Sequence, residues 1–143
     1  MMKIAIINGP NLNLLGTREP SIYGVETFES YYKKIQEAYS DVEFVYYQSN
    51  VEGELINFLQ DVSAICDGVV INPGGYSHTS VALADCISAI STKVVEVHIS
   101  NIHARETFRQ QSITGSKVSV VITGAGLAGY ELAVRYLTNR VVL

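Results

Sequence analysis

Groups suited to acid–base chemistry gather between positions 96 and 109 of the chain. Glu96 and His98 are two residues apart, so on an extended strand their side chains point to the same side. A carboxylate that holds one ring nitrogen of a histidine fixes the tautomer and orients the ring. The pattern therefore predicts that Glu96 positions His98 for proton transfer.

Anion-binding groups follow in the same segment. The backbone amides of Ile99 and Ser100 come at the end of the expected strand, where they are free to bind an anion. Arg105 and Arg109 are four residues apart and share one face of a short helix expected at 104–111. Two arginines on one face favour recognition of a carboxylate or a polyol. The alternative is an ordinary helix with ion pairs to Glu106.

A second polar segment, NPGGYSHTS, runs from Asn72 to Ser80. Its two glycines allow the backbone to approach a ligand closely, and its Thr and Ser can cap the helix that follows. His78 either faces the ligand or is a structural histidine that the helix dipole keeps neutral. Asp85 lies in the apolar helix that follows, where it is expected to be exposed or paired across an interface.

A long loop follows the first strand. Gly24 comes sixteen positions after Asn8, whereas loops after strands in such folds usually have about two to six residues. Long loops at a ligand edge are often lids. This loop carries one cation, Arg18, and one phenol, Tyr23. The alternative is a surface loop with a solvated arginine and a packed tyrosine.

Apolar runs rich in Val and Ile alternate with helical patterns along the chain. Runs without polar alternation are typical of parallel strands buried on both faces. The expected strands are 3–8, 43–48, 68–72, 93–98 and 117–123. The expected longer helices are 25–39, 52–65, 80–90 and 127–139. The alternation predicts an α/β fold in a single domain over 1–143, a flavodoxin-like doubly wound sheet of five parallel strands in the order 2-1-3-4-5.

Ligands of such sheets bind beyond the carboxyl ends of the strands, where all three polar segments fall. The lysines do not gather there. Lys3, Lys93 and Lys117 are expected at the opposite edge, and Lys33 and Lys34 in the first helix. The sequence therefore predicts no lysine placed to form a Schiff base at the site.

The composition excludes several classes of protein. The chain has 143 residues, a net charge of −4 and no basic run, which argues against nucleic-acid binding. Hydrophobic residues make up 48%, so the chain is not disordered, and no apolar run approaches the roughly 18 residues of a membrane span. Charged residues are only 17%, which suggests burial of surface in an oligomer. The amino-terminal run lacks the features of a signal peptide, so we expect a cytoplasmic protein.

Four segments, 8–24, 72–80, 96–109 and 124–129, occur in the order and spacing of type II 3-dehydroquinate dehydratases. The stretches NGPNLNLLGTREPSIYG and EVHISNIHARETFR are highly specific, and the resemblance covers nearly the whole chain. It implies a lyase that removes water from 3-dehydroquinate to give 3-dehydroshikimate through an enolate, in the shikimate pathway or in quinate catabolism. It also implies a flavodoxin-like fold, no metal or organic cofactor, and a homododecamer built as a tetramer of trimers.

The resemblance implies a role for each residue that matches the family's motifs. Tyr23 corresponds to the catalytic base and Arg18 to the lid arginine that activates it. His98 corresponds to the general acid, and Asn11 to the residue that holds a water near the developing enolate.

Further matches concern substrate binding and support. The residues that bind the substrate hydroxyls correspond to Asn72, His78 and Arg109. The amides that hold the substrate carboxylate correspond to Ile99 and Ser100, and the supporting positions correspond to Glu96 and Arg105. Asp85 corresponds to an aspartate that reaches the active site of a neighbouring subunit.

Three other functions fit the fold less well. A flavin or phosphate module needs a loop rich in Ser, Thr and Gly after the first strand, and this loop is too apolar and too long. A phosphoryl-receiver domain needs acidic residues at two strand ends and a lysine after the fifth strand, where this chain has Asn8, Asn72 and Gly124. An inactive relative kept for protein interactions is disfavoured by the intact acid and base positions.

Overall fold

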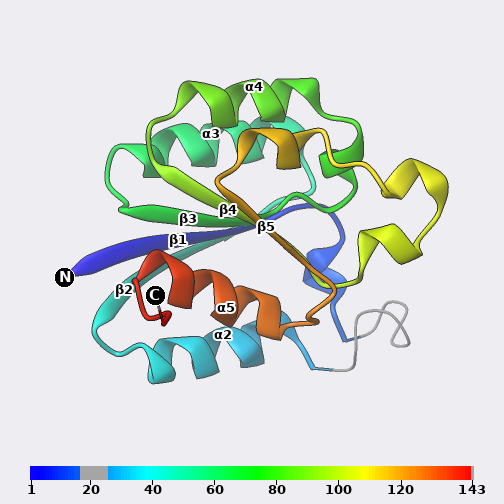
Figure 1. Cartoon of the computed structure of the whole chain (residues 1–143). Helices are drawn as coiled ribbons and strands as arrows, with labels where there is room; N and C mark the ends of the chain where they lie inside the picture. The colour runs from blue at the N-terminus through cyan, green and yellow to red at the C-terminus, as the bar shows by residue number, and fades with distance from the viewer. Residues whose placement is uncertain (17–25, 143) are drawn as a thin grey trace.

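A computed structural model of the chain describes residues 1–16 and 26–142. In this part of the chain, five parallel strands form one sheet in the order β2-β1-β3-β4-β5 (Figure 1). The strands are β1 (Met2–Asn8), β2 (Val42–Gln48), β3 (Gly68–Asn72), β4 (Lys93–His98) and β5 (Val120–Thr123). The predicted fold class and strand order are confirmed.

Two layers of helices cover the sheet (Figure 1). The helices α2 (Phe28–Ala38) and α5 (Ala128–Leu137) pack on one face, and α3 (Glu52–Ser63) and α4 (Val81–Ala89) pack on the other. Successive residues of a strand point to opposite faces, and both faces of the central strands β1, β3 and β4 are buried. This double burial explains why the strands read as continuous apolar runs in the sequence.

Hydroxyl side chains cap two of the helices. Thr27 Oγ1 accepts a hydrogen bond from the Ser30 amide at 3.2 Å and caps α2, which begins at Phe28. The predicted start at position 25 lies outside the described residues. Ser80 Oγ accepts from the Leu83 amide at 2.9 Å, as predicted for the residue before α4. The cap of α4 fixes where the preceding polar segment ends.

The prediction of a helix at 104–111 is wrong. Two short 3₁₀ turns, η3 (Ile102–Ala104) and η4 (Thr107–Arg109), take its place, and Arg105 between them has an extended backbone. Tertiary contacts hold the segment open, because the Gln110 side chain donates to the Arg105 carbonyl at 3.0 Å and Arg105 Nη1 donates to Ser100 Oγ at 3.1 Å. The two arginines therefore do not share a helix face.

The fifth strand is shorter than predicted. The 3₁₀ turn η5 (Thr114–Lys117) occupies the expected strand start, and β5 begins only at Val120. The Ser119 amide donates to the Val94 carbonyl at 2.9 Å and brings the chain alongside β4. The late start leaves a long connection before β5, and this connection passes close to the carboxyl end of β4.

The glycine-rich turn before α5 serves tight packing. Gly124 and Gly126 have positive φ angles of 88° and 63°. A β-carbon on Gly129 would lie 3.0 Å from Val97 Cγ1, so the glycine lets α5 approach β4 closely. Cys66 and Cys86 are buried free thiols. Across the described ranges, no helix has the length and apolar character needed to span a membrane.

Candidate active site

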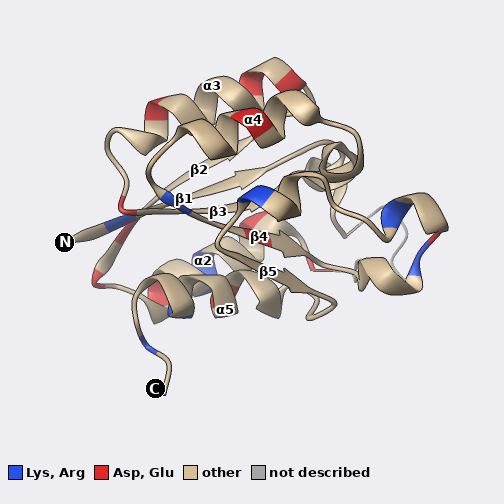
Figure 2. Ribbon diagram, turned by 45° about the horizontal axis from the view of Figure 1, so that its top comes forward, with Lys and Arg blue, Asp and Glu red and all other residues tan. Residues whose placement is uncertain are grey.

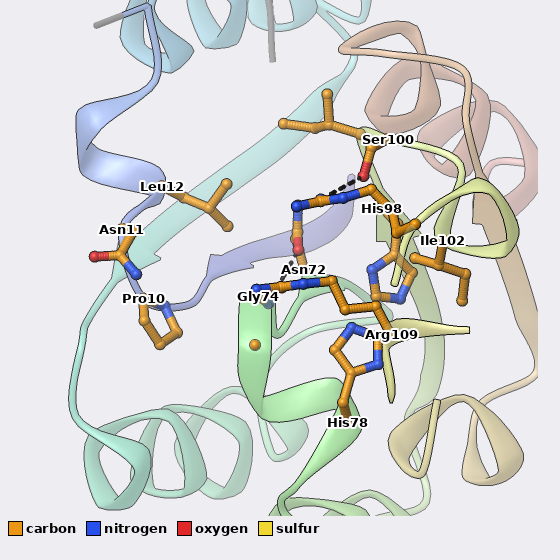
Figure 3. A pocket seen from close by; sticks show the side chains of 13 residues that line it. Pro10, Asn11, Leu12, Asn72, Gly74, His78, His98, Ser100, Ile102 and Arg109 are labelled. Carbon is orange, nitrogen blue, oxygen red and sulfur yellow. Dashed lines mark hydrogen bonds between the residues drawn. The ribbon is translucent and has the colours of Figure 1, made fainter. Parts of the chain in front are cut away.

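A pocket of about 130 Å³ lies beyond the carboxyl ends of β1, β3 and β4. Figure 3 shows Pro10, Asn11 and Leu12 on one side of it and His78, His98 and Ile102 on the other. The residues that line it are Pro10, Asn11, Leu12, Asn72, Gly74, Gly75, His78, His98, Ile99, Ser100, Ile102, Arg105 and Arg109. The segment after β4, which carries residues of both charges in Figure 2, supplies its cationic side.

Glu96 and His98 form a buried pair at the end of β4. Their side chains point to the same face of the strand, and His98 Nε2 lies 2.7 Å from Glu96 Oε2. Glu96 is 0% exposed and His98 is 5% exposed. An ionised carboxylate can only accept, so Nε2 carries the proton and Nδ1 is the nitrogen available to a ligand. The predicted contact is present.

Two further donors hold the Glu96 carboxylate. Ser112 Oγ donates to Oε2 at 2.7 Å, and Thr114 Oγ1 donates to Oε1. Burial by itself would raise the pKa of Glu96, but the hydrogen bonds and the charge of His98 outweigh burial and lower the pKa below its ordinary value. Glu96 is therefore an anion in the interior beside an imidazole.

His78 reaches the pocket from η2 (Gly74–His78), beside the ring of His98. The two ring centroids are 6.1 Å apart, and Figure 3 shows the rings next to each other. His78 Nδ1 lies 2.8 Å from the Gln111 carbonyl oxygen, which can only accept, so Nδ1 carries a proton. Its Nε2 is then the nitrogen left for a ligand.

Arg105 and Arg109 both line the pocket, although no continuous helix carries them. Arg105 Nη1 donates to Ser100 Oγ, and Arg109 Nε donates to Glu106 Oε2 at 3.0 Å. Glu106 also lies 3.5 Å from Arg105 Nε, and its hydrogen bond with Arg109 lowers the pKa of Glu106. Arg105 and Arg109 therefore line the pocket and also form ion pairs with Glu106.

The turn after β4 places Ile99 and Ser100 at the pocket. The Ile99 carbonyl accepts from the Gly126 amide at 3.0 Å, and the Ser100 carbonyl accepts from Thr123 Oγ1 at 3.0 Å. The peptide bond between Ile99 and Ser100 is trans, because no cis peptide bond occurs in the described residues. The Ser100 N–H therefore points opposite to the Ile99 carbonyl, which the Gly126 amide holds. Hydrogen bonds on the β5 side therefore turn this N–H away from β5.

Asn72 is fixed at the base of the pocket by its neighbours. Its Nδ2 donates to the Tyr130 hydroxyl at 3.0 Å, and its Oδ1 accepts from the Gly74 amide at 3.1 Å. Tyr130, fully buried in α5, donates in turn to Asn8 Oδ1 at 2.7 Å. Asn72 therefore presents an amide of fixed orientation, with one N–H already taken.

Asn11 lies at the start of the turn η1 (Leu12–Leu14) with a φ of 70°. Asparagine tolerates this left-handed backbone better than most residues. The Asn11 amide donates to Asn50 Oδ1 at 2.9 Å, which ties the turn to the chain after β2. Asn11 thus faces the pocket from the side opposite His98 (Figure 3).

Three predicted site residues are not in the pocket of the described chain. Tyr23 and Arg18 lie outside the described residues. Asp85 is exposed on α4 and does not line the pocket of its own chain. Its placement is compatible with a role across an interface, which stays a prediction.

The sequence reasoning missed the residues that hold the predicted ones. Asn8 and Tyr130 fix Asn72, while Ser112 and Thr114 fix Glu96. One signal was available for Tyr130, since a tyrosine on the apolar face of a helix must find a partner for its hydroxyl.

For the described ranges, no group of three or more His, Cys, Asp or Glu side chains is placed to hold a metal ion.

Comparison with known proteins places the chain in one family. Residues 2–138 match the family model described as dehydroquinase class II. A 3-dehydroquinate dehydratase of Fusobacterium nucleatum is 53% identical over 141 residues, covering 95% of this chain and 96% of the relative. One of Clostridium acetobutylicum is 49% identical over 140 residues, covering 96% and 97%.

Solved structures agree with the sequence matches. The type II dehydroquinase of Butyrivibrio crossotus superposes with a TM-score of 0.93 at 45% identity, covering 96% of this chain and 97% of the other. The type II dehydroquinase of Propionibacterium acnes gives 0.93 at 37% identity, covering 97% of each chain. On the family match, these identities and the shared fold, the chain belongs to the class II dehydroquinase family.

Proposed function

We propose that this chain is a 3-dehydroquinate dehydratase, a hydro-lyase that converts 3-dehydroquinate into 3-dehydroshikimate and water. The observation that carries the proposal is the buried Glu96–His98 pair, which opens into a pocket also lined by Asn72 and two arginines. In a member of this family, that arrangement supplies a proton donor beside groups that bind hydroxyls and a carboxylate.

The elimination requires a base and an acid. We assign Tyr23 as the base that removes a proton α to the ketone, which leaves an enolate. A tyrosine has an ordinary pKa of about 10, so a phenolate at neutral pH needs a nearby cation. One charge at about 4 Å contributes about 4 kcal/mol at an effective dielectric constant of about 20, and Arg18 is the cation assigned. The C–O bond then breaks, and the leaving hydroxyl takes a proton from His98 and departs as water.

The remaining pocket residues bind the substrate. Asn72, His78 and Arg109 are assigned to the hydroxyl groups, which suits an amide N–H, a ring nitrogen and a guanidinium at the pocket wall. The amides of Ile99 and Ser100 are assigned to the carboxylate.

Two assignments support these contacts. Asn11 holds a water that stabilises the enolate oxygen, because donors aimed at developing charge lower the barrier. Arg105 supports the carboxylate site through its hydrogen bond to Ser100 Oγ.

The proposal extends to assembly and context. We propose one catalytic domain over 1–143 in a homododecamer, a tetramer of trimers, in the cytoplasm. The role proposed is the shikimate pathway of aromatic amino-acid biosynthesis, with quinate catabolism as the alternative. Asp85 is assigned to the active site of a neighbouring subunit. Its support is an exposed carboxylate on α4, one turn from Val81, an apolar side chain that is 60% exposed.

The test is conversion of 3-dehydroquinate by the purified protein, followed by the ultraviolet absorbance of the conjugated enone. Turnover should survive a chelator and borohydride treatment in the presence of substrate. An assembled, folded protein that produces no enone would overturn the proposal and favour a role in binding alone. Loss of turnover on borohydride treatment would instead indicate Schiff-base chemistry.

A further inference from the structure

Two hydroxyl groups complete the hydrogen bonding of the Glu96 carboxylate. Ser112 donates to Oε2 at 2.7 Å, Thr114 donates to Oε1, and His98 Nε2 also donates to Oε2. Thr114 is 0% exposed, as is Glu96. A carboxylate without water is stable as an anion only where other donors replace the water. At Glu96, the hydroxyls of Ser112 and Thr114 take the place of water as donors.

The connection before β5 is shaped for this contact. The Gly115 amide donates to Ser112 Oγ at 2.9 Å, so the serine accepts from the backbone and donates to Glu96. A β-carbon on Gly115 would lie 3.0 Å from Ser112 Oγ and 3.1 Å from Glu96 Oε2. Glycine at this position therefore lets the segment 111–115 close over the carboxylate.

The segment 111–115 also holds the second histidine of the pocket. The Gln111 carbonyl accepts from His78 Nδ1 at 2.8 Å, and the Ile113 amide donates to the Ser77 carbonyl at 2.7 Å. The two histidines thus receive different partners. His98 donates to an anionic carboxylate, whereas His78 donates to a neutral carbonyl.

We propose that Ser112 and Thr114 are positioning residues that keep Glu96 ionised and directed at His98, so that His98 carries the proton given to the leaving group. The inference rests on the proposed dehydratase function. It adds two residues that act through Glu96 and do not line the pocket.

The surroundings make Glu96 depend on these hydroxyls. The residues in register with Glu96 on the neighbouring strands are Ile71 on β3 and Val121 on β5, and both are apolar. Among the described residues, the charged or titratable side chains that line the pocket together with His98 are His78, Arg105 and Arg109. Removal of the Thr114 hydroxyl should therefore raise the pKa of Glu96.

The variant Thr114→Val keeps the side-chain shape and removes only the donor. We expect kcat to fall about tenfold with KM nearly unchanged, and the low-pH limb of the kcat profile to move to higher pH. Ser112→Ala should act in the same direction. Thr114→Ser should restore both the rate and the profile, because it returns the hydroxyl.

Ser116→Ala is the matched control, since Ser116 is exposed in the same turn and donates to the Ile113 carbonyl instead of Glu96. Each variant is checked by circular dichroism for native folding. A folded Thr114→Val protein with the kcat profile of the wild type would overturn the inference. Equal losses in Thr114→Val and Thr114→Ser would also overturn it.

A second readout separates this inference from the proposed function. Carbon-13 NMR of the Glu96 carboxyl group follows its titration without substrate. The titration should move to higher pH in Thr114→Val and stay unchanged in Ser116→Ala. If the wild type produced no enone, the proposed function would fail, while this titration would still decide whether the hydroxyls hold Glu96 ionised.

Discussion

Asn8 and Asn72 end two neighbouring parallel strands in register, and the hydroxyl of Tyr130 joins their side-chain amides. The hydroxyl donates to Asn8 at 2.7 Å and accepts from Asn72 at 3.0 Å. One phenol from the last helix thereby sets the orientation of an amide at the base of the pocket. The Tyr130 hydroxyl thus connects the core beneath α5 to the base of the pocket.

Tyr130→Phe should lower the free energy of unfolding by about 1–3 kcal/mol, because it leaves two buried amide groups without their shared partner. The same change should raise KM, because the Asn72 amide is no longer held in one orientation. Urea unfolding and steady-state kinetics measure the two effects. Tyr136→Phe, on the same helix but half-buried, should change both by much less.

Contacts between distant parts of the chain explain what the sequence could not predict. The apolar runs predicted the strands, and the two-residue spacing of Glu96 and His98 predicted their contact. The partner of Asn72 lies 58 residues away and the partner of Asn8 lies 122 residues away, so no repeating pattern in the sequence indicates these two hydrogen bonds. Helical spacing of two arginines suggested a helix where side-chain and backbone contacts hold 3₁₀ turns instead.

Gly9→Ala should disturb the pocket from the β1 side. A β-carbon at Gly9 would lie 2.5 Å from the Pro73 carbonyl oxygen, so the turns after β1 and β3 would have to separate. We expect a loss of about 1–3 kcal/mol in stability and a fall in turnover. Gly53→Ala is the control, because nothing lies within 4 Å of its β-carbon. A Gly9→Ala protein as stable and active as Gly53→Ala would contradict the close approach.

The stability contribution of Glu96 should depend on pH. Its pKa is lowered on folding from the ordinary value of 4.5, so its contribution is complete above that value and is lost as the pH falls through the lowered pKa. Glu96→Gln should therefore lower the free energy of unfolding at neutral pH, and the difference from wild type should shrink in acid. Urea titrations at several pH values test this, with exposed Glu37→Gln as control. A difference that is constant with pH would contradict the assigned ionisation.

Asp85→Ala tests whether a carboxylate crosses between subunits. The variant should lose activity as a homo-oligomer, whereas exposed Asp61→Ala on α3 should not. Mixed oligomers of Asp85→Ala and His98→Asn subunits should regain part of the activity, because an intact His98 can then meet an Asp85 from its neighbour. Mixed oligomers that form and stay inactive would place Asp85 outside the neighbouring site.

The most direct test of the account compares wild type with His98→Asn in the conversion of 3-dehydroquinate, measured by enone absorbance, with substrate binding measured by calorimetry. We predict turnover by the wild type and a loss of about 100-fold or more in kcat for the variant, with binding changed far less, because a general acid contributes mainly to the transition state. A His98→Asn protein that keeps nearly the wild-type kcat, or a folded and assembled wild type that forms no enone, would contradict the account.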